Sequence, residues 1–486
     1  MSVDLEILIA RFRWPAASTK LWAMQELADL LLAPEFQVRV TEQLLNELAR
    51  CRLEAEVVEV LCIFWIAFKQ GYTPPSMLAS QVRKPSLLAE LLLADMEQDL
   101  NCEHNPPLEL APTAFEIPER FKKIHELGIP GIYLTVLRSL EKRTRLPFVA
   151  QCAFEWANTD NAYPEAPLQG DVGHFLRSLG PGVTGTFSNR ATLRMQSAYQ
   201  RTLDVARLHW GMPEITALEK AKAVLPIDPT LAFLRPRRPS WLLLPGKDVA
   251  TGAAEMETYV RGLIKSAEAT QAGAVLLSFA SPAYVDSREI VELTVVRWRR
   301  WGTSDFDTNA LANRFDERQK RWGYGACFTD LWGCVSYVPQ LHLDDIRDEE
   351  SNAAPMAAVF GFDRYGYLHG DLHPSRLYYP VVTDVEGNVT VEPNGGELDI
   401  STPNGKLGKL YYWNMGWHPV HPLGSSAFCA TALFGEADAI TASFNPAADS
   451  HFYLWTIRRM KRAYDYEPFE ADEPLHGIVI VTGAPI

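Results

Sequence analysis

The stretch Ala274–Trp301, AVLLSFASPAYVDSREIVELTVVRWRRW, decides the fold of the second half of the chain. Its pattern predicts two strands joined by a turn at residues 282–286. In the second strand Val291, Leu293 and Val295 recur at every second position, which is typical of a strand with one buried face. We therefore expect this hairpin to belong to a sheet.

The second of these strands ends in alternating cations and indoles, and the helix predicted for residues 309–322 ends in the same way. Arginine neutralises phosphates and tryptophan stacks on bases, so single-stranded nucleic acid is one candidate ligand. Both residue types are also enriched where proteins bind proteins, which makes a protein partner another candidate. In a third interpretation the indoles are core residues and the arginines pair with carboxylates. The candidate binding residues are Arg297, Trp298, Arg299, Arg300, Trp301, Arg318, Arg321 and Trp322.

The composition is that of a globular protein with several domains. The chain has 486 residues, of which 47% are hydrophobic and 22% are charged, and this length is too great for a single core. Its net charge of −14 argues against a protein that binds nucleic acid or anionic membranes over its whole surface. A local basic patch is still able to bind phosphate.

The cysteines and the N-terminal sequence indicate where in the cell the protein is located. Seven cysteines are scattered without a CxxC pair, which disfavours a secreted disulfide framework. The start, MSVDLEILIARFRW, carries acidic residues early and matches neither a signal peptide nor a transit peptide. The chain lacks the run of about 18 apolar residues that a transmembrane span needs. We expect a cytoplasmic protein with reduced thiols and no membrane insertion.

Four helices are predicted before residue 70, from apolar residues spaced three and four apart. Each is too short to be stable alone, and breaks fall at Pro15, at Ala33 and Pro34, and at residues 71–75. This pattern suits antiparallel pairs that bury one another in a short α-solenoid. The predicted helices span residues 5–12, 20–32, 36–51 and 54–69.

The segment Arg11–Pro15, RFRWP, begins a pattern that extends into the next helix. The pattern continues through Lys20, Trp22, Ala23, Glu26, Leu27 and Leu30. It resembles the HEAT-like helical segments of large bacterial conflict and antiphage defence proteins, over residues 1–100. The resemblance implies HEAT-like repeats in this part of the chain and a role in bacterial defence, and it implies no catalytic residue.

Residues 101–234 are expected to form a second helical domain with loops rich in proline and glycine. Its longest helix is predicted for residues 188–210, and Gly211 stops it. The segment 234–240, LRPRRPS, is the expected hinge to the rest of the chain. The arginines of the long helix are expected on a solvated face, and they are Arg190, Arg194, Arg201 and Arg207.

Residues 240–486 are expected to form a mixed α/β domain. Short segments of β-branched or aromatic residues, separated by glycine-containing turns, indicate a largely antiparallel sheet. The predicted fold class is α+β and multidomain, with an α-helical, HEAT-like region followed by this mixed domain. Helices are predicted here for residues 253–269, 309–322 and 447–464, and residues 425–441 are expected to contain a helix of small residues.

The segment Leu368–Arg376, LHGDLHPSR, resembles the catalytic loop of kinases of the aminoglycoside-phosphotransferase type. The resemblance implies that Asp371 takes the proton of a substrate hydroxyl. Arg376 stands where that family has a metal-binding asparagine, and arginine cannot coordinate a cation. A β-turn with a satisfied His–Asp pair is the alternative interpretation.

Histidine spacing suggests a second kind of chemistry. His369 and His373 are four residues apart, a spacing that can place two imidazoles on one metal ion, and His418 and His421 are three apart. An extended proline-rich loop is the simpler interpretation of the second pair. Further ligands would come from Cys327, Cys334, Asp371 or Asp399. The pattern is too weak for us to predict a bound metal or cofactor.

These patterns together favour recognition as the function. We expect an intracellular bacterial scaffold protein that binds a protein partner within an antiphage defence system. One alternative is an enzyme, either a metal-dependent nuclease or a phosphotransferase, that uses His369, Asp371 and His373. The other is a single-stranded nucleic-acid binder that uses the strand end at residues 297–301.

Overall fold

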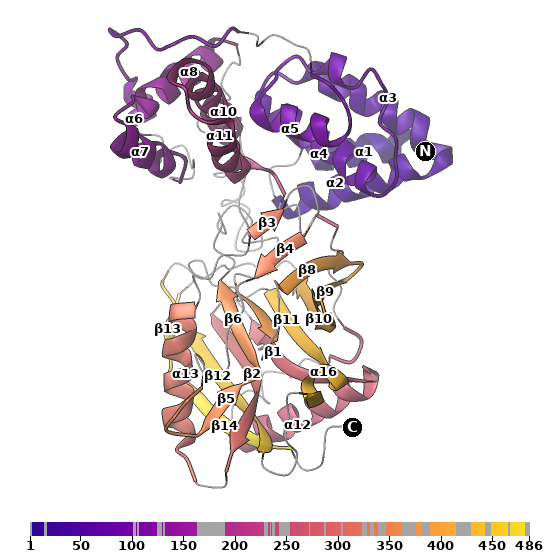
Figure 1. Ribbon diagram of the computed structural model, residues 1–486, viewed down its shortest axis with the longest axis vertical. Coiled ribbons are helices and arrows are strands. Elements are labelled where there is room, and N and C mark those ends of the chain that lie inside the picture. The colour runs from indigo at the N-terminus through magenta and orange to yellow at the C-terminus, as the bar shows by residue number, and fades with distance from the viewer. Residues whose placement is uncertain are drawn as a thin grey trace. The chain divides into compact units, whose positions relative to one another are not determined.

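The chain folds into two compact units, one made of helices and one built on a sheet (Figure 1). The helical unit comprises residues 1–178 and 185–228, and the sheet unit comprises residues 179–184 and 229–486. The predicted α+β layout, with helices first and a largely antiparallel sheet after them, is confirmed. The structure, a computed structural model, describes residues 2–13, 17–100, 104, 106–123, 129, 132–162, 190–227, 232–233, 235, 239–242, 253–271, 273–285, 288–302, 305–322, 328–330, 335–338, 347–361, 376–380, 389–414, 429–442, 449–464 and 467–481.

The helical unit consists of helices that proline, glycine and short loops separate. None of the helices anywhere in the described part of the chain combines the length and the apolar character that crossing a membrane requires. The elements of this unit are α1 (Ser2–Phe12), α2 (Ala17–Leu32), α3 (Pro34–Arg50), α4 (Glu54–Lys69), η1 (Ala79–Gln81), α5 (Leu87–Asp95), α6 (Glu119–Lys122), α7 (Ile132–Thr144), α8 (Phe148–Ala162), α10 (Arg190–Trp210), α11 (Glu214–Ala221) and η4 (Lys222–Val224).

Helix α4 is the centre of the helical unit, because it is apolar on almost every side. All its residues from 54 to 67 are buried, and α2, α3, α5 and α10 pack around it. The carboxylate of Glu56 stabilises its first turn by accepting hydrogen bonds from the backbone N–H groups of Arg52, at 2.8 Å, and Leu53, at 3.2 Å. The chain turns away at Gly71, whose φ of +99° is one that residues with a Cβ rarely adopt.

Helix α10 packs against α4 and α8, and two of its arginines are buried. Arg194 and Arg201 are each 2% exposed, so the prediction of a solvated face is wrong for both. The guanidinium of Arg194 lies 4.5 Å from the centre of the Trp156 ring, and burial lowers its pKa to about 10. Arg201 pairs with Glu54 of α4 and Glu155 of α8. The sequence of one helix does not show carboxylates that other helices contribute.

The sheet unit is organised around one large antiparallel sheet. Its strand order is β13-β12-β2-β1-β11-β10-β9-β8-β4-β3, with β14 also paired to β12 and β5 to β2, whereas β6 and β7 pair with each other. The strands are β1 (Ala274–Val285), β2 (Glu289–Trp301), β3 (Phe328–Asp330), β4 (Val335–Val338), β5 (Ala353–Pro355), β6 (Ala357–Gly361), β7 (Arg376–Pro380), β8 (Val389–Asn394), β9 (Glu397–Thr402), β10 (Gly405–Asn414), β11 (Cys429–Glu436), β12 (Asp449–Lys461), β13 (Glu470–Ala471) and β14 (Leu475–Ile480). The helices of this unit are α12 (Ala253–Thr270), α13 (Thr308–Trp322) and α16 (Ala437–Ala442).

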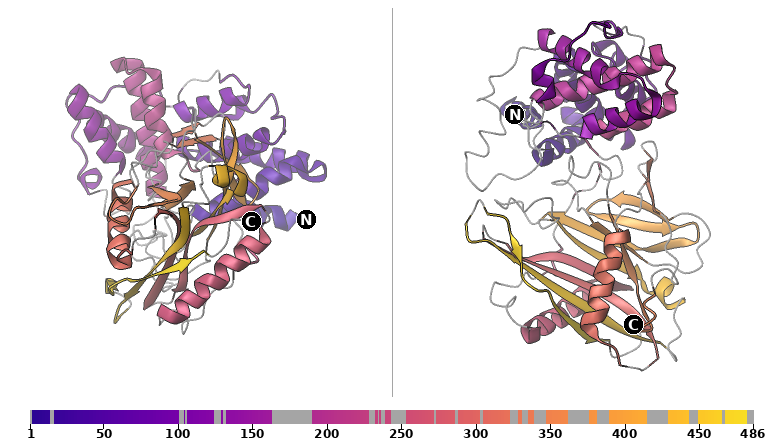
Figure 2. Two further views of the ribbon diagram at one scale, coloured as in Figure 1. Left: turned by 60° about the horizontal axis from the view of Figure 1, so that its bottom comes forward. Right: turned by 90° about the vertical axis from the view of Figure 1, so that its left-hand side faces the viewer.

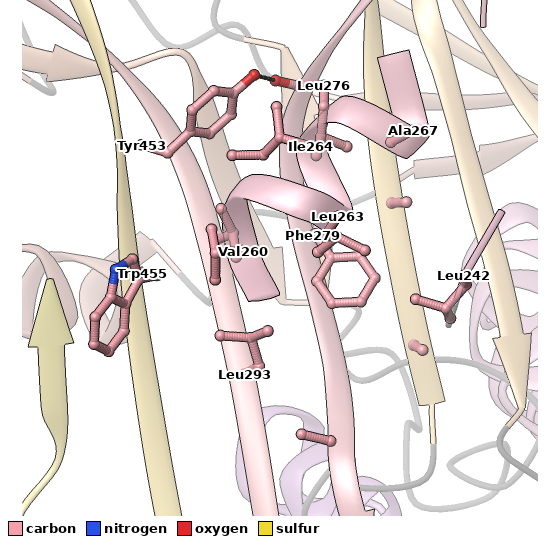
Figure 3. Packing of buried hydrophobic residues seen from close by; sticks show 14 of the residues in the cluster. Leu242, Val260, Leu263, Ile264, Ala267, Leu276, Phe279, Leu293, Tyr453 and Trp455 are labelled. Carbon is pink, nitrogen blue, oxygen red and sulfur yellow. Dashed lines mark hydrogen bonds between the residues drawn. The ribbon is translucent and has the colours of Figure 1, made fainter. Parts of the chain in front are cut away.

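Helices cover both faces of this sheet, α12 on one and α13 on the other (Figure 2). On β2, the side chains of Val291, Leu293 and Val295 belong to the core beneath α12, which Figure 3 shows from close by. Val296 and Trp298 belong to the core beneath α13. The expected alternation is present over residues 291–295, where Glu292 and Thr294 are half-buried, but residues 295–298 are buried on both faces of the strand.

One segment predicted as a helix is a strand. Residues 447–464 contain β12, which pairs with β2 along its whole length. Residues 425–441 do contain the expected helix of small residues, α16, but strand β11 precedes it. Both strands have neighbours on two sides within the sheet. Burial on both faces removes the polar and apolar alternation that marks a strand in a sequence. Packing in the sheet therefore outweighs the local pattern.

Candidate functional site

The residues predicted for catalysis or metal binding are mostly outside the described residues: Cys327, Cys334, His369, Asp371, His373, His418 and His421. Asp399 lies in β9, where its carboxylate accepts hydrogen bonds from Asn394, at 2.9 Å, and from Lys406. It therefore holds neighbouring strands of the sheet together. Within the described ranges, no cluster of three or more His, Cys, Asp or Glu side chains is arranged to hold a metal ion.

The described cysteines of the helical unit are unsuited to nucleophilic chemistry. Cys51, Cys62 and Cys152 are buried free thiols. Burial raises the pKa of Cys51 and of Cys152 to about 12. Because the thiolate is the nucleophile, these side chains stay unreactive at neutral pH.

Two of the predicted binding residues at the end of β2 are buried. Trp298 is 1% exposed, and the centre of its ring lies 5.0 Å from that of Phe315 and 6.1 Å from that of Phe452. Arg297 is 2% exposed and donates hydrogen bonds to Tyr453 Oη, at 3.1 Å, and to His451 Nδ1, at 3.2 Å. Both side chains therefore belong to the core, as one of the three interpretations of this strand expects.

The remaining end of β2 gathers cations around one indole. The guanidinium carbons of Arg299 and Arg347 lie 5.1 Å and 4.9 Å from the centre of the Trp301 ring. Arg318 donates a hydrogen bond to the backbone oxygen of Arg347, at 2.6 Å, and lies 3.7 Å from a carboxylate oxygen of Asp348. These contacts join α13 and the segment around residue 348 to the strand end.

Among the other predicted binding residues, the side chain of Arg300 lies within the described part of the chain. The guanidinium of Arg300 lies 4.9 Å from the centre of the Phe306 ring. The side chains of Arg321 and Trp322, at the end of α13, lie outside the part of the chain that the structure describes. The strand end is therefore divided between the core and a network of internal contacts.

The helical unit contains an apolar groove between α1, α2 and α3. Its volume is about 310 Å³. A cavity of about 150 Å³ is enough for a benzene ring, so this groove has room for two large apolar side chains. Most of the side chains that line it are apolar, among them Leu5, Ile7, Leu8, Trp22, Phe36 and Val40. We call this feature the α1–α3 groove.

Some apolar side chains of the α1–α3 groove are open to solvent. Ile7 is 47% exposed and Trp22 is 42% exposed. The guanidinium carbon of Arg11 lies 5.2 Å from the centre of the Trp22 ring, and this cation–π contact holds the indole in place. Exposed apolar side chains that gather in a hollow are typical of binding sites, whereas scattered ones are ordinary.

Four charged side chains also line the groove. Asp4 and Glu26 already interact with other groups of the chain. Arg11 and Arg39 are exposed, and neither forms a hydrogen bond or an ion pair with the described residues. The four formal charges cancel, but Arg11 and Arg39 are the two of these groups that remain available to a ligand.

The sequence did not predict the α1–α3 groove, although residues that line it stood out for another reason. Arg11, Trp22, Glu26 and Leu30 belong to the pattern that resembles HEAT-like segments. The signal that was available lies in α1, SVDLEILIARF, which has apolar residues on more than one side. An apolar surface wider than one neighbouring helix can cover leaves part of itself exposed.

The α1–α3 groove is the candidate functional site, because it joins an exposed apolar surface to unsatisfied cations. At the end of β2, by contrast, Trp298 lies in the core, and the indole of Trp301 is in contact with Arg299 and Arg347. No protein-family model, no curated protein and no solved structure matches the chain.

Proposed function

We propose that the chain is a recognition protein whose α1–α3 groove binds a segment of a partner protein. The observation that carries the proposal is the exposure of Ile7 and Trp22 in a groove of about 310 Å³. A partner that covered both side chains would remove their apolar surface from water. That removal is the dominant favourable term in most protein association, and tryptophan is among the residues most enriched at its energetic centres.

A protein is a better partner for this groove than a nucleic acid. The chain carries a net charge of −14, which repels a phosphate backbone outside local patches. The groove is lined mainly by apolar side chains, whereas binding to nucleic acid depends on cations along a surface. The burial of Arg297 and Trp298 also removes two residues from the alternative surface on β2.

The proposal also includes the biological system in which the partner is bound and the cellular location of the protein. The resemblance of residues 1–100 to HEAT-like segments supports a partner within a bacterial antiphage defence system, and the scattered cysteines, which contain no CxxC pair, support a cytoplasmic location. The enzyme alternative, a nuclease or phosphotransferase, rests on His369, Asp371 and His373, which lie outside the described residues. It stays a prediction from the sequence.

A selection of displayed helical peptides on the immobilised full-length protein tests the proposal. We expect peptides that bind the wild-type protein and lose at least about tenfold in affinity for the Ile7→Glu variant. The new carboxylate would have to give up its water on entering an apolar contact, which costs binding free energy. Isothermal titration calorimetry of each peptide with both proteins measures the loss.

Ile215 supplies a matched control for this substitution. It lies on α11 of the same unit, is 73% exposed and does not line the groove. The Ile215→Glu variant should bind the selected peptides as tightly as the wild-type protein does. A selection that enriches no peptide, or peptides that bind Ile7→Glu as well as wild type, would contradict the proposed function.

A further inference from the structure

The charged side chains at the α1–α3 groove indicate which charge a partner carries beside its apolar face. Asp4 and Glu26 are engaged within the chain, whereas Arg11 and Arg39 have no hydrogen-bonding or ionic partner among the described residues. Arg11 belongs to α1 and Arg39 to α3, so the two cations come from two walls of the groove. A ligand whose apolar part fills the groove and whose edge carries carboxylates would complement both features.

The walls of the groove also restrict the backbone conformation of the occupant. They consist of side chains from three helices, and most of these are apolar, such as Leu5, Leu8 and Val40. An extended segment would bring unpaired N–H and C=O groups against a surface that offers few hydrogen bonds. A helix satisfies these groups internally and presents only side chains, so it suits this groove better than a strand does.

The volume of the groove sets the number of anchoring side chains. About 310 Å³ accommodates two large apolar side chains. Side chains three or four residues apart lie on one face of a helix, about one turn from each other. The anchors are therefore expected one turn apart, with the acidic residues on the flanks of that apolar face.

We infer that the α1–α3 groove receives an acidic amphipathic helix of a partner protein, with two apolar side chains in the groove and carboxylates paired with Arg11 and Arg39. The inference rests on the proposed function and adds the chemical class of the partner. The partner's acidic flanks approach Arg11 and Arg39, because these are the cations that the chain leaves uncompensated. Arg39 is the more available of the two, since Arg11 also contacts Trp22.

Two displayed helix libraries with the same randomised apolar face test this inference. In one library the flanking positions are glutamate, and in the other they are lysine. On the full-length wild-type protein we expect the glutamate library to give binders at least about tenfold tighter than the lysine library does, because like charges across an interface are unfavourable. The preference should weaken as salt is added, since exposed pairs are screened.

Charge reversal at the groove provides the second arm of the test. In the Arg11→Glu/Arg39→Glu variant the preference is expected to reverse, so that the lysine library gives the tighter binders. If this variant unfolds at a lower temperature than the wild-type protein, Arg39→Gln alone should still reduce the preference for glutamate. Arg138→Glu is the control, because Arg138 is exposed on α7 and does not line the groove. It should leave the preference unchanged.

The outcomes separate this inference from the proposed function. Binders that depend on Ile7 but show no preference between the two libraries would overturn the acidic helix and leave partner recognition standing. The same holds if the preference is unchanged in both groove variants. Failure of both libraries to yield binders that depend on Ile7 would overturn the proposed function itself.

Discussion

Replacing Arg201 by methionine is expected to destabilise the helical unit by about 3–5 kcal/mol. The Arg201 Nε atom lies 2.7 Å from a carboxylate oxygen of Glu155, and its Nη1 atom lies 3.2 Å from one of Glu54. It also donates hydrogen bonds to the backbone oxygens of Pro106, at 3.0 Å, and Pro107, at 3.1 Å. Methionine has a similar length and no charge, so the variant leaves two carboxylates buried without their cation.

The loss of folding stability in Arg201→Met is expected to depend on pH. Burial raises the pKa of Glu54 and of Glu155 in the folded protein, and Arg201 opposes that rise. Without Arg201 both pKa values rise further above those of the unfolded chain. The folded state then holds more protons than the unfolded state, so its stability is greatest at low pH and falls as the pH rises through the folded-state values. We expect a smaller destabilisation at about pH 5 than at about pH 8.

Amide hydrogen exchange in α4, α8 and α10 of the full-length protein measures this effect locally. A loss of about 3–5 kcal/mol corresponds to a decrease in protection of roughly two to four orders of magnitude. The control is Arg138→Met, which changes an exposed arginine of α7 and should alter stability by less than about 0.5 kcal/mol. Unchanged protection in Arg201→Met would show that the buried ion cluster does not stabilise the unit.

Replacing Trp298 by alanine is expected to destabilise the sheet unit by about 3–5 kcal/mol. The indole is almost fully buried between the sheet and α13, where it stacks on Phe452 with an angle of 12° between the rings and meets Phe315 edge-on at 71°. Removing it takes apolar surface out of the core and leaves a cavity. Urea unfolding followed by near-ultraviolet circular dichroism measures the change, together with exchange of the β2 amides.

Trp301 is the matched control for this substitution, because it lies three residues further along the same strand. Its side chain is partly exposed, and its indole ring contacts the guanidinium groups of Arg299 and Arg347. Cation–π contacts at exposed sites contribute about 0.5–1 kcal/mol each. Trp301→Ala should therefore cost about 1–2 kcal/mol, which is less than the loss expected for Trp298→Ala. Equal losses would contradict the assignment of Trp298 to the core and Trp301 to the surface.

The sequence predicts the layout, with helices first and a largely antiparallel sheet after them, and it predicts the pairing of β1 with β2, but it does not predict that β12 is a strand. The β-branched residues of β2 predict a strand. Strand β12, DSHFYLWTIRRMK, ends in cations, which suggested the polar face of a helix. In the structure Arg458 pairs with Asp316 of α13, and Arg459 lies 3.1 Å from Glu289 of β2. These partners are far away in sequence, so no local pattern could indicate them.

The candidate site was less predictable than the fold. Trp298 and Trp301 are the same residue type on one strand, and only the presence of α13 over one face of the sheet makes the first a core residue. The α1–α3 groove depends on how three helices pack, which periodicity within each helix does not determine. What the sequence does show is that α1 is apolar on more than one side. That property predicts exposed apolar surface without locating it.

Hydrogen–deuterium exchange of the full-length protein, with and without the tightest peptide from the glutamate library, tests the central claim most directly. The account predicts that the peptide slows exchange in α1, α2 and α3, that is, in residues 2–12, 17–32 and 34–50. It also predicts no change in these helices for the Ile7→Glu variant at the same peptide concentration. Slowed exchange confined to β2 and α13, or none in the three helices, would contradict recognition through the α1–α3 groove.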